Sequence, residues 1–304
     1  MCDLSSPKFH NQDAAREYLE RIRWPDGPVC PRCDRQEPVR PLRGKSMGKG
    51  WYYCKGCQDK FTVRVGTIYE RSHIPLHKWV AGMHLMAASK KGISAHQLHR
   101  MLKITYKSAW FMAHRIREAM KDDSPEPMGG PGSAVQADET YFGNKEGPKK
   151  PGRRGIAPGP ANKRAIISLI SGGEARTFHV ARADAQTVRR ILVTNVHRES
   201  ELHTDESRIY PRVGQEFTAH KTVVHTAGQY VGPSGESTNK VENYFSIFKR
   251  GMRGVYQHCA EKHLQRYINE FDFRYSTRDL QDAERAAMAH KQAEGKRLTY
   301  RRIG

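Results

Sequence analysis

The sequence of 304 residues contains no uninterrupted apolar run of about 18 residues, the length that a membrane-spanning helix needs. The opening stretch, Met1 to Tyr18, is polar and charged and has no apolar core of a secretory signal, which favours a cytoplasmic protein. Cysteine is also scarce: six residues are too few for a disulfide scaffold in a chain of this size. Hydrophobic residues make up only 37%, so we expect a limited core with basic surfaces and loops.

Acidic residues are few compared with basic ones. The chain has 32 Asp and Glu against 52 Lys and Arg, which gives a formal net charge of +20. A charge of this sign and size favours a polyanionic partner, with nucleic acid the leading candidate. A basic protein of the ribosomal type is the alternative that charge alone leaves open.

Four of the six cysteines form two CxxC pairs separated by 20 residues, namely Cys30, Cys33, Cys54 and Cys57. Each pair can lie on a tight turn that directs two thiolates at one ion, and four sulfur ligands in a tetrahedron suit Zn²⁺. Short strand-like segments at 39–42, 51–53 and 61–63 complete the pattern of a zinc ribbon. The alternatives are a redox CxxC motif or chance spacing.

We therefore assign residues 1–70 to a zinc ribbon with an N-terminal helix. Four sulfur ligands leave no open position for substrate, so the zinc is expected to be structural and to supply folding free energy. Basic residues surround the cysteines, but the sequence does not separate DNA contact from protein docking as the role of this module.

Residues 71–121 predict a group of helices with a helix-turn-helix pattern. Apolar residues recur at helical spacing from Leu76, a second helix begins after Ser94, and a third follows the turn at 103–105. The third helix is expected to direct its basic residues outward, namely Lys107, His114, Arg115 and Arg117. Lys107, Arg115 and Arg117 are then the candidate DNA contacts. The alternative is a plain helical hairpin with a solvated basic face.

A linker rich in Pro, Gly and Ser at 122–133 separates these helices from a second domain at 134–280, which a basic tail follows at 281–304. Strands are predicted at 134–142, 165–171, 175–180, 201–205 and 221–225, and helices at 184–195, 237–251 and 262–275. The Gly- and Lys-rich stretch 143–163 is expected to be a mobile loop. This order is that of the RNase H-like fold, an α/β fold with a mixed sheet flanked by helices.

Two aspartates on the predicted strands are candidates for an active site. Asp138 lies in the middle of an otherwise neutral strand, where an acid is costly unless it binds something. Asp205 ends a later strand, and sites are commonly built at strand ends in such folds. Side chains alternate along a strand, so Glu139 is expected to face away from the site that Asp138 lines.

The helix at 237–251 brings a third acid. Its polar stripe contains Asn239, Glu242, Ser246 and Lys249, and its apolar stripe contains Val241, Tyr244, Phe245 and Phe248. If the apolar stripe packs on the sheet, the polar stripe lies within reach of the aspartates. Clustered carboxylates are the expected ligands of the divalent ions that serve phosphodiester cleavage and transfer. Lys249, Arg250 and Arg253 would then contact DNA near the scissile phosphate.

The chain resembles the zinc-ribbon insertion-sequence transposases of the ISXO-like group, within the DDE superfamily. The segments that carry the resemblance are 24–33, 61, 66–68, 138–143, 203–205 and 237–251, of which the last is the most specific. The resemblance implies an RNase H-like catalytic domain, dependence on Mg²⁺ or Mn²⁺, and recognition of inverted terminal repeats. It also implies a prokaryotic protein associated with the nucleoid.

The third metal ligand stays open between two residues of the same helix face. In this family the position is occupied by Glu or Asn and is followed by Lys, and here both Asn239 and Glu242 precede Lys249. The spacing of seven from Glu242 to Lys249 is the usual one for DDE enzymes, and a carboxylate is the better ligand for Mg²⁺. We therefore favour Glu242 and retain Asn239 as a site residue.

The sequence as a whole predicts a metal-dependent DNA transposase that binds inverted repeats, cleaves double-stranded DNA at element ends and transfers the strand to a target. One alternative is a zinc-ribbon DNA-binding regulator without catalysis, although binding alone gains nothing from carboxylates that face phosphate. Another is a nuclease with the same site. Because two ends must be joined, we expect a homo-oligomer to act.

Overall fold

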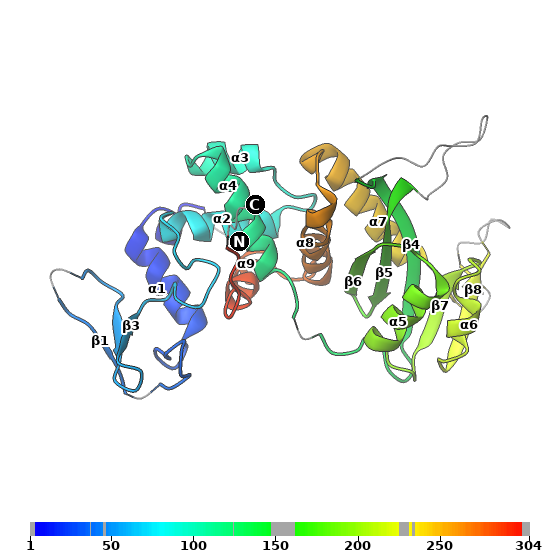
Figure 1. Ribbon diagram of the computed structural model, residues 1–304, viewed down its shortest axis with the longest axis horizontal. Coiled ribbons are helices and arrows are strands. Elements are labelled where there is room, and N and C mark those ends of the chain that lie inside the picture. Colours follow the sequence, from blue (N-terminus) through cyan, green and yellow to red (C-terminus); the bar gives the residue numbers. More distant parts are fainter. Residues whose placement is uncertain are drawn as a thin grey trace. The chain divides into compact units, whose positions relative to one another are not determined.

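The computed structural model describes residues 4–36, 38–44, 47–123, 125–146, 162–224, 231–232 and 235–299. Most of the predicted basic loop at 143–163 and residue 225 of the last predicted strand lie outside these ranges. The chain forms two compact units (Figure 1). Unit 1 contains Met1–Lys121 and Asp279–Gly304, and unit 2 contains Asp122–Arg278.

Unit 1 contains a small antiparallel sheet in the region of the CxxC pairs. Its strands are β1 (Val39–Pro41), β2 (Tyr52–Cys54) and β3 (Asp59–Phe61), in that spatial order. Tyr52 stacks on Phe61 with ring centroids 5.6 Å apart, and Trp24 meets both rings edge-on. These three rings form much of the apolar packing of the ribbon, which is too small to bury more.

The helices of unit 1 come from both ends of the sequence. They include η1 (Pro7–Phe9), α1 (Gln12–Arg23), α2 (Leu76–Ala88) and α9 (Asp282–Lys291). Residues 281–304 were predicted to form a separate basic tail, whereas α9 packs against α2 and α1. His290 of α9 lies 2.7 Å from the Tyr69 hydroxyl in a buried contact, and Ala289 and Ala293 are fully buried. Small apolar residues spaced along α9 thus attach it to the helices of unit 1.

Two further helices of unit 1 lie on either side of the predicted turn. They are α3 (Ala95–Leu102) and α4 (Tyr106–Ala119). The Ser94 hydroxyl caps α3 by accepting from the Gln97 amide, and the Thr105 hydroxyl caps α4 by accepting from the Ser108 amide. Between them Lys103 takes a left-handed conformation with φ of 48°. These features agree with the predicted turn at 103–105.

Unit 2 is built on a five-stranded mixed sheet. Its strands are β4 (Ala134–Asn144), β5 (Lys163–Ser171), β6 (Glu174–Val180), β7 (Glu201–Asp205) and β8 (Ala219–Val223). The spatial order is β6-β5-β4-β7-β8, in which β4, β5 and β6 are antiparallel and β7 and β8 run parallel to β4. This order, with helices on both faces, is the RNase H-like fold that the sequence predicted.

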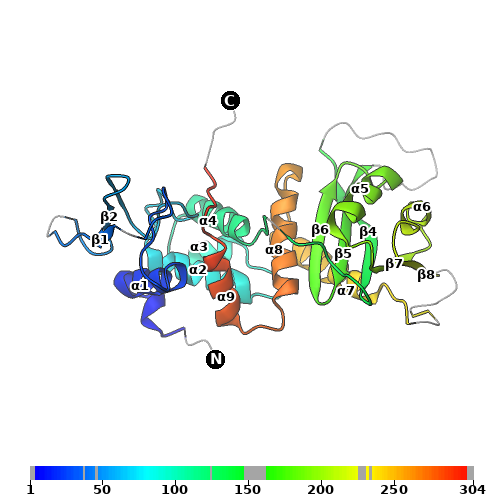
Figure 2. The ribbon, with the colours of Figure 1, turned by 90° about the horizontal axis from the view of Figure 1, so that it is seen from below.

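Helices cover both faces of this sheet (Figure 2). One face packs against α5 (Ala185–Asn195) and α6 (Pro211–Gly214), and the other packs against α7 (Asn239–Gly251) and α8 (Leu264–Ser276). The short helices η4 (Met252–Tyr256) and η5 (Glu261–His263) join α7 to α8. The apolar stripe predicted for α7 is buried as expected, with Val241, Tyr244, Phe245 and Phe248 in the core.

Alternation along β4 decides which side chain meets which helix layer. Val135 and Ala137 enter the core on the α5 face, so Gln136 and Asp138 belong to the α7 face. In the part of the chain that the structure describes, no helix has the length and apolar character needed to cross a membrane.

Candidate active site

Adjacent parallel strands bring the two predicted aspartates together. Gln136 of β4 is paired with His203 of β7, and two residues further along the same register lie Asp138 and Asp205. Asp205 is the last residue of β7, whereas β4 continues to Asn144. The site therefore lies at an edge where one strand ends and its neighbour extends beyond it.

Glu139 joins this pair, which corrects the prediction that it faces away from the site. One carboxylate oxygen from each of Asp138, Glu139 and Asp205 lies within 4.8 Å of the others. Glu139 accepts hydrogen bonds from the Tyr210 hydroxyl at 2.7 Å and from the Ser207 hydroxyl at 3.2 Å. Because β7 stops at Asp205, the long side chain of Glu139 can approach the pair from the other face of the sheet.

The three carboxyl groups are held at an electrostatic cost. Burial, together with the charges of Asp205 and Glu139, raises the pKa of Asp138 to about 8. Burial likewise raises the pKa of Glu139, although its hydrogen bond from Tyr210 acts in the opposite direction. A bound divalent cation relieves such repulsion, and Mg²⁺ and Mn²⁺ prefer oxygen ligands. The donor set of this cluster therefore fits a divalent metal ion.

Helix α7 brings Glu242 towards Asp138. Glu242 lies in the first turn of α7, where it accepts a hydrogen bond of 2.6 Å from the Thr238 hydroxyl. Its charge is among those that raise the pKa of Asp138, so the two carboxyls lie within electrostatic reach of each other. Glu242 is nevertheless outside the group within 4.8 Å. Asn239, the other candidate, is exposed at the first position of α7.

The basic residues of α7 lie on the same polar stripe or just beyond it. Burial lowers the pKa of Lys249, whereas the charge of Asp138 acts to raise it, which places this ammonium within electrostatic reach of the site. Arg250 is exposed and donates to the Ser246 hydroxyl at 2.8 Å. Arg253 is exposed in η4. Three positive charges thus lie in the last turn of α7 and in η4.

In unit 1 the four predicted cysteines converge. Their sulfur atoms lie within 4.8 Å of one another, with 3.9 Å between Cys30 and Cys57 and 3.7 Å between Cys33 and Cys54. Spacings of this size match four thiolates that share one tetrahedral ion. A closed set of four sulfur ligands fits structural zinc.

The basic face predicted for α4 is largely wrong. Lys107 is exposed near the start of the helix, as expected, but His114, Arg115 and Arg117 are buried at 1%, 6% and 2% exposure. The Arg115 guanidinium donates to the carbonyl oxygens of Ile68, Glu70 and Leu298, so it joins three segments of unit 1. The buried positions of Arg115 and Arg117 contradict the expectation that they point outward.

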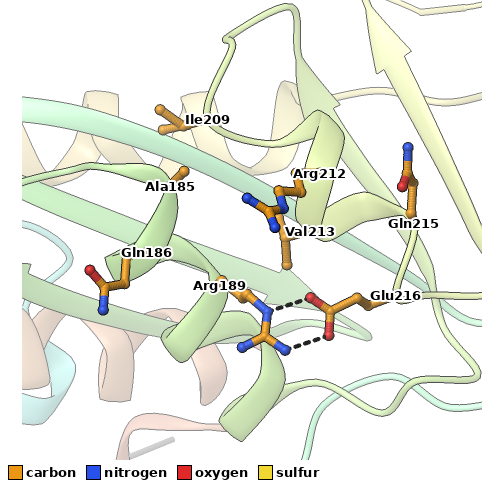
Figure 3. A pocket seen from close by; sticks show the side chains of 8 residues that line it. All are labelled: Ala185, Gln186, Arg189, Ile209, Arg212, Val213, Gln215 and Glu216. Carbon is orange, nitrogen blue, oxygen red and sulfur yellow. Dashed lines mark hydrogen bonds and ion pairs between the residues drawn. The ribbon is translucent and has the colours of Figure 1, made fainter.

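A hollow between α5 and α6 is separate from the carboxylates (Figure 3). The Arg189 guanidinium forms two hydrogen bonds with the Glu216 carboxylate across it, at 2.5 and 3.0 Å. Arg198 binds the same carboxylate at 2.8 Å, and the pKa of Glu216 is lowered because Arg189 and Arg198 donate to it. This charge arrangement ties α5 to the segment after α6.

Comparison with known proteins agrees with these two centres. Residues 129–276 match the ISXO2-like transposase domain, and residues 10–60 match the transposase zinc-ribbon domain. The chain thus carries an ISXO2-like transposase domain. It is therefore a DDE-type transposase, a polynucleotidyl transferase, whose zinc ribbon precedes an RNase H-like catalytic domain.

One relative and three solved structures give context. The chain is 29% identical over 286 residues to an uncharacterized protein in transposable element ISH50 of Halobacterium salinarum, covering 88% of this chain and 91% of the relative. A simian T-cell lymphotropic virus intasome matches with a TM-score of 0.30 at 13% identity, over 58% of this chain and 67% of that chain. The Mos1 strand transfer complex matches with a TM-score of 0.28 at 9% identity, over 70% of this chain and 74% of that chain. The Mos1 pre-cleavage transpososome matches with a TM-score of 0.26 at 9% identity, over 72% of this chain and 80% of that chain. The fold assignment therefore rests on the strand order and the family.

Proposed function

We propose that this transposase binds the inverted ends of its own insertion sequence, cleaves a strand there and joins the freed 3′-hydroxyl to target DNA. The observation that carries the proposal is the convergence of Asp138 and Asp205 from two parallel strands, with Glu242 of α7 within electrostatic reach of Asp138. Carboxylates that gather on a chain of charge +20 would repel DNA unless a cation lies between them.

In this proposal Asp138, Asp205 and Glu242 hold Mg²⁺ or Mn²⁺, and Glu139 is a fourth carboxylate within reach. Such ions, when bound, make a water or a 3′-hydroxyl more nucleophilic and stabilise the leaving oxygen. The protein itself orients the substrate: Lys249 holds the phosphate next to the scissile bond, and Arg250 and Arg253 hold the backbone beside it. Asn239 would contribute at the rim of the site rather than as a ligand.

Unit 1 is proposed to recognise the element ends. In this proposal Lys107, which is exposed near the start of α4, contacts DNA as part of a recognition helix, and zinc stabilises the ribbon. The partner is double-stranded DNA in a prokaryotic cytoplasm, at the nucleoid. We propose that two or more protomers act together, because both ends of an element must be joined.

The test uses the purified protein and DNA that carries the element ends. Asp138→Ala and Asp205→Ala are expected to abolish strand cleavage in Mg²⁺ or Mn²⁺ while end binding, measured by mobility shift, stays within about twofold. Asp184→Asn is the matched control, because Asp184 caps α5 away from the cluster and Asn caps equally well. Full cleavage by either alanine variant refutes the assigned site.

Two rival functions give different outcomes in the same assay. A regulator without catalysis would bind end DNA but show no divalent-metal dependence that the alanine variants remove. A nuclease would produce cleaved ends without joined products. Detection of a joined product on a gel, with a target plasmid present, therefore distinguishes a transposase from both.

A further inference from the structure

Gln136 connects the strand of Asp138 with the helix of Glu242. It lies in β4, two residues before Asp138 and on the same face of the sheet, and only 8% of its surface is exposed. A buried amide needs hydrogen-bond partners on both its oxygen and its nitrogen. The partners of Gln136 lie at the beginning of α7.

The Gln136 side chain takes the place of a helix cap. Its carbonyl oxygen accepts from the backbone amides of Lys240 at 3.0 Å and Val241 at 3.4 Å, which belong to the first turn of α7. Its amide nitrogen lies 3.4 Å from the Ser237 hydroxyl. Amides of a first helical turn have no partner within the helix and are usually met by the N-cap side chain.

The residue at the N-cap position, Thr238, does not serve this purpose. Its side chain forms no capping hydrogen bond, and its hydroxyl instead donates to the Glu242 carboxylate at 2.6 Å. Thr238 is itself fully buried. The first turn of α7 is thus capped from β4, which leaves the cap residue of the helix free to orient Glu242.

We propose that Gln136 is a positioning residue that fixes Glu242 relative to Asp138. Gln136 and Asp138 are two residues apart on one strand, a distance of about 7 Å. Glu242 follows the two capped amides directly, in the same turn. One side chain thereby sets the position of the first turn of α7 against β4, and with it the separation of two carboxyls that come from different elements. The inference rests on the proposed function, because it assumes that Asp138 and Glu242 hold one metal site.

The variant Gln136→Met removes both hydrogen-bonding atoms and keeps the length of the side chain. Residues that orient metal ligands typically change metal affinity by about 10- to 100-fold when they are lost. We therefore expect Mn²⁺ to bind at least about tenfold more weakly, as measured by the free-ion signal in electron paramagnetic resonance without DNA. Hydrogen exchange at the Lys240 and Val241 amides should accelerate by about tenfold.

Two further variants isolate the positioning role. Gln136→Glu keeps an oxygen acceptor, which a helix N-terminus favours, and should retain Mn²⁺ affinity within about threefold and amide protection. Gln265→Met is the matched control. Gln265 also accepts a hydrogen bond from a backbone amide, that of His179 at 2.7 Å, and donates to the Thr177 carbonyl oxygen. These bonds connect α8 to β6 rather than α7 to β4. It should lower stability without changing Mn²⁺ affinity.

The outcomes separate failure of this inference from failure of the proposed function. If Gln136→Met binds Mn²⁺ as tightly as the unmodified protein while Asp138→Ala loses Mn²⁺ binding, the positioning role is refuted but the proposed metal site is not. Equal loss of affinity in Gln136→Met and Gln265→Met also refutes it, because the effect would then follow from general destabilisation. Mn²⁺ binding that survives Asp138→Ala refutes the metal site and the inference with it.

Discussion

Removing the charge of Asp138 should stabilise the metal-free transposase. In the variant Asp138→Asn the side chain keeps its shape but no longer repels its neighbours. Asp138, Glu139 and Asp205 bring carboxylate oxygens within 4.8 Å of one another. Two unit charges at that distance repel by about 3.5 kcal/mol at an effective dielectric constant of about 20. Burial of the Asp138 charge adds to this cost.

The pKa of Asp138 sets an upper limit to the effect and its pH window. A folded-state pKa of about 8, against the ordinary value of 3.8, corresponds to about 6 kcal/mol of destabilisation once the group is ionised. A raised pKa means that the folded state holds its proton more tightly, so the cost grows as pH rises from about 4 and is complete above about 8. At pH 9 we therefore expect Asp138→Asn to be more stable by about 3 to 6 kcal/mol.

The assay must follow unit 2 alone. All four tryptophans lie in unit 1, so their fluorescence in urea reports only the unit that should not respond. Hydrogen exchange of the β4 and β5 amides over the same urea series reports unit 2. The free energy of unfolding of unit 2 should increase in the variant, while the tryptophan transition stays unchanged.

Magnesium supplies the complementary measurement. At pH 7.5, 10 mM Mg²⁺ should stabilise unit 2 of the unmodified protein by about 1.4 kcal/mol if the dissociation constant is about 1 mM, and should not stabilise Asp138→Asn. Asp184→Asn, at the cap of α5, should behave like the unmodified protein in both measurements. If Asp138→Asn is no more stable at pH 9, or if it still gains stability from Mg²⁺, the reasoning about this cluster is wrong.

Two further predictions concern residues outside the carboxylate cluster. Lys107→Ala should weaken binding to any DNA and lower its salt dependence by about one counterion, which mobility shifts at several salt concentrations measure. Arg115→Ala should destabilise unit 1 by about 3 kcal/mol because buried carbonyls lose a charged donor, which tryptophan fluorescence in urea measures. A defect in DNA binding without loss of stability in Arg115→Ala would contradict the structural role of Arg115. Burial raises the pKa of Asp272 to about 7 even though the Tyr244 hydroxyl donates to it. Asp272 should therefore lower the stability of unit 2 by up to about 4 kcal/mol as pH rises from about 4 to 7, in addition to the cost of Asp138 over the same window. In urea melts followed by hydrogen exchange, Asp272→Asn should make this slope shallower and leave the part due to Asp138; an unchanged slope would show that Asp272 does not titrate there.

The parts of the site that periodicity encodes could be predicted from the sequence. The apolar stripe of α7 is buried as its spacing indicates. Asp138 and Asp205 lie on neighbouring strands, which could be predicted because the order of elements is compatible with only a few sheet topologies. Glu139 was missed because alternation describes where a side chain starts, not how far it reaches. Its partner Tyr210 is 71 residues away in sequence, and nothing local signals that contact.

Buried cations were the other source of error. A basic residue on a helix is normally placed in solvent, since burial of a charge costs several kcal/mol unless it is paired. Arg115 avoids that cost by donating to backbone carbonyls from two distant segments, at Ile68 and Leu298. The same long-range packing turns the predicted C-terminal tail into α9. Contacts of this kind depend on tertiary structure, and a single sequence does not specify them by pattern.

Four consecutive residues of β4 explain why the carboxyls of the candidate site meet where they do. Gln136 caps α7 on one face of the sheet, and Ala137 is buried in the core on the other. Asp138 then lies within electrostatic reach of Glu242, while Glu139 accepts a hydrogen bond from Tyr210, which immediately precedes α6. Because β4 is the central strand, the helical layers on both faces of the sheet contact the same short segment. A shift of β4 by one residue would exchange the two faces and separate every one of these contacts, so the geometry of the site and the register of the sheet are a single property of this fold.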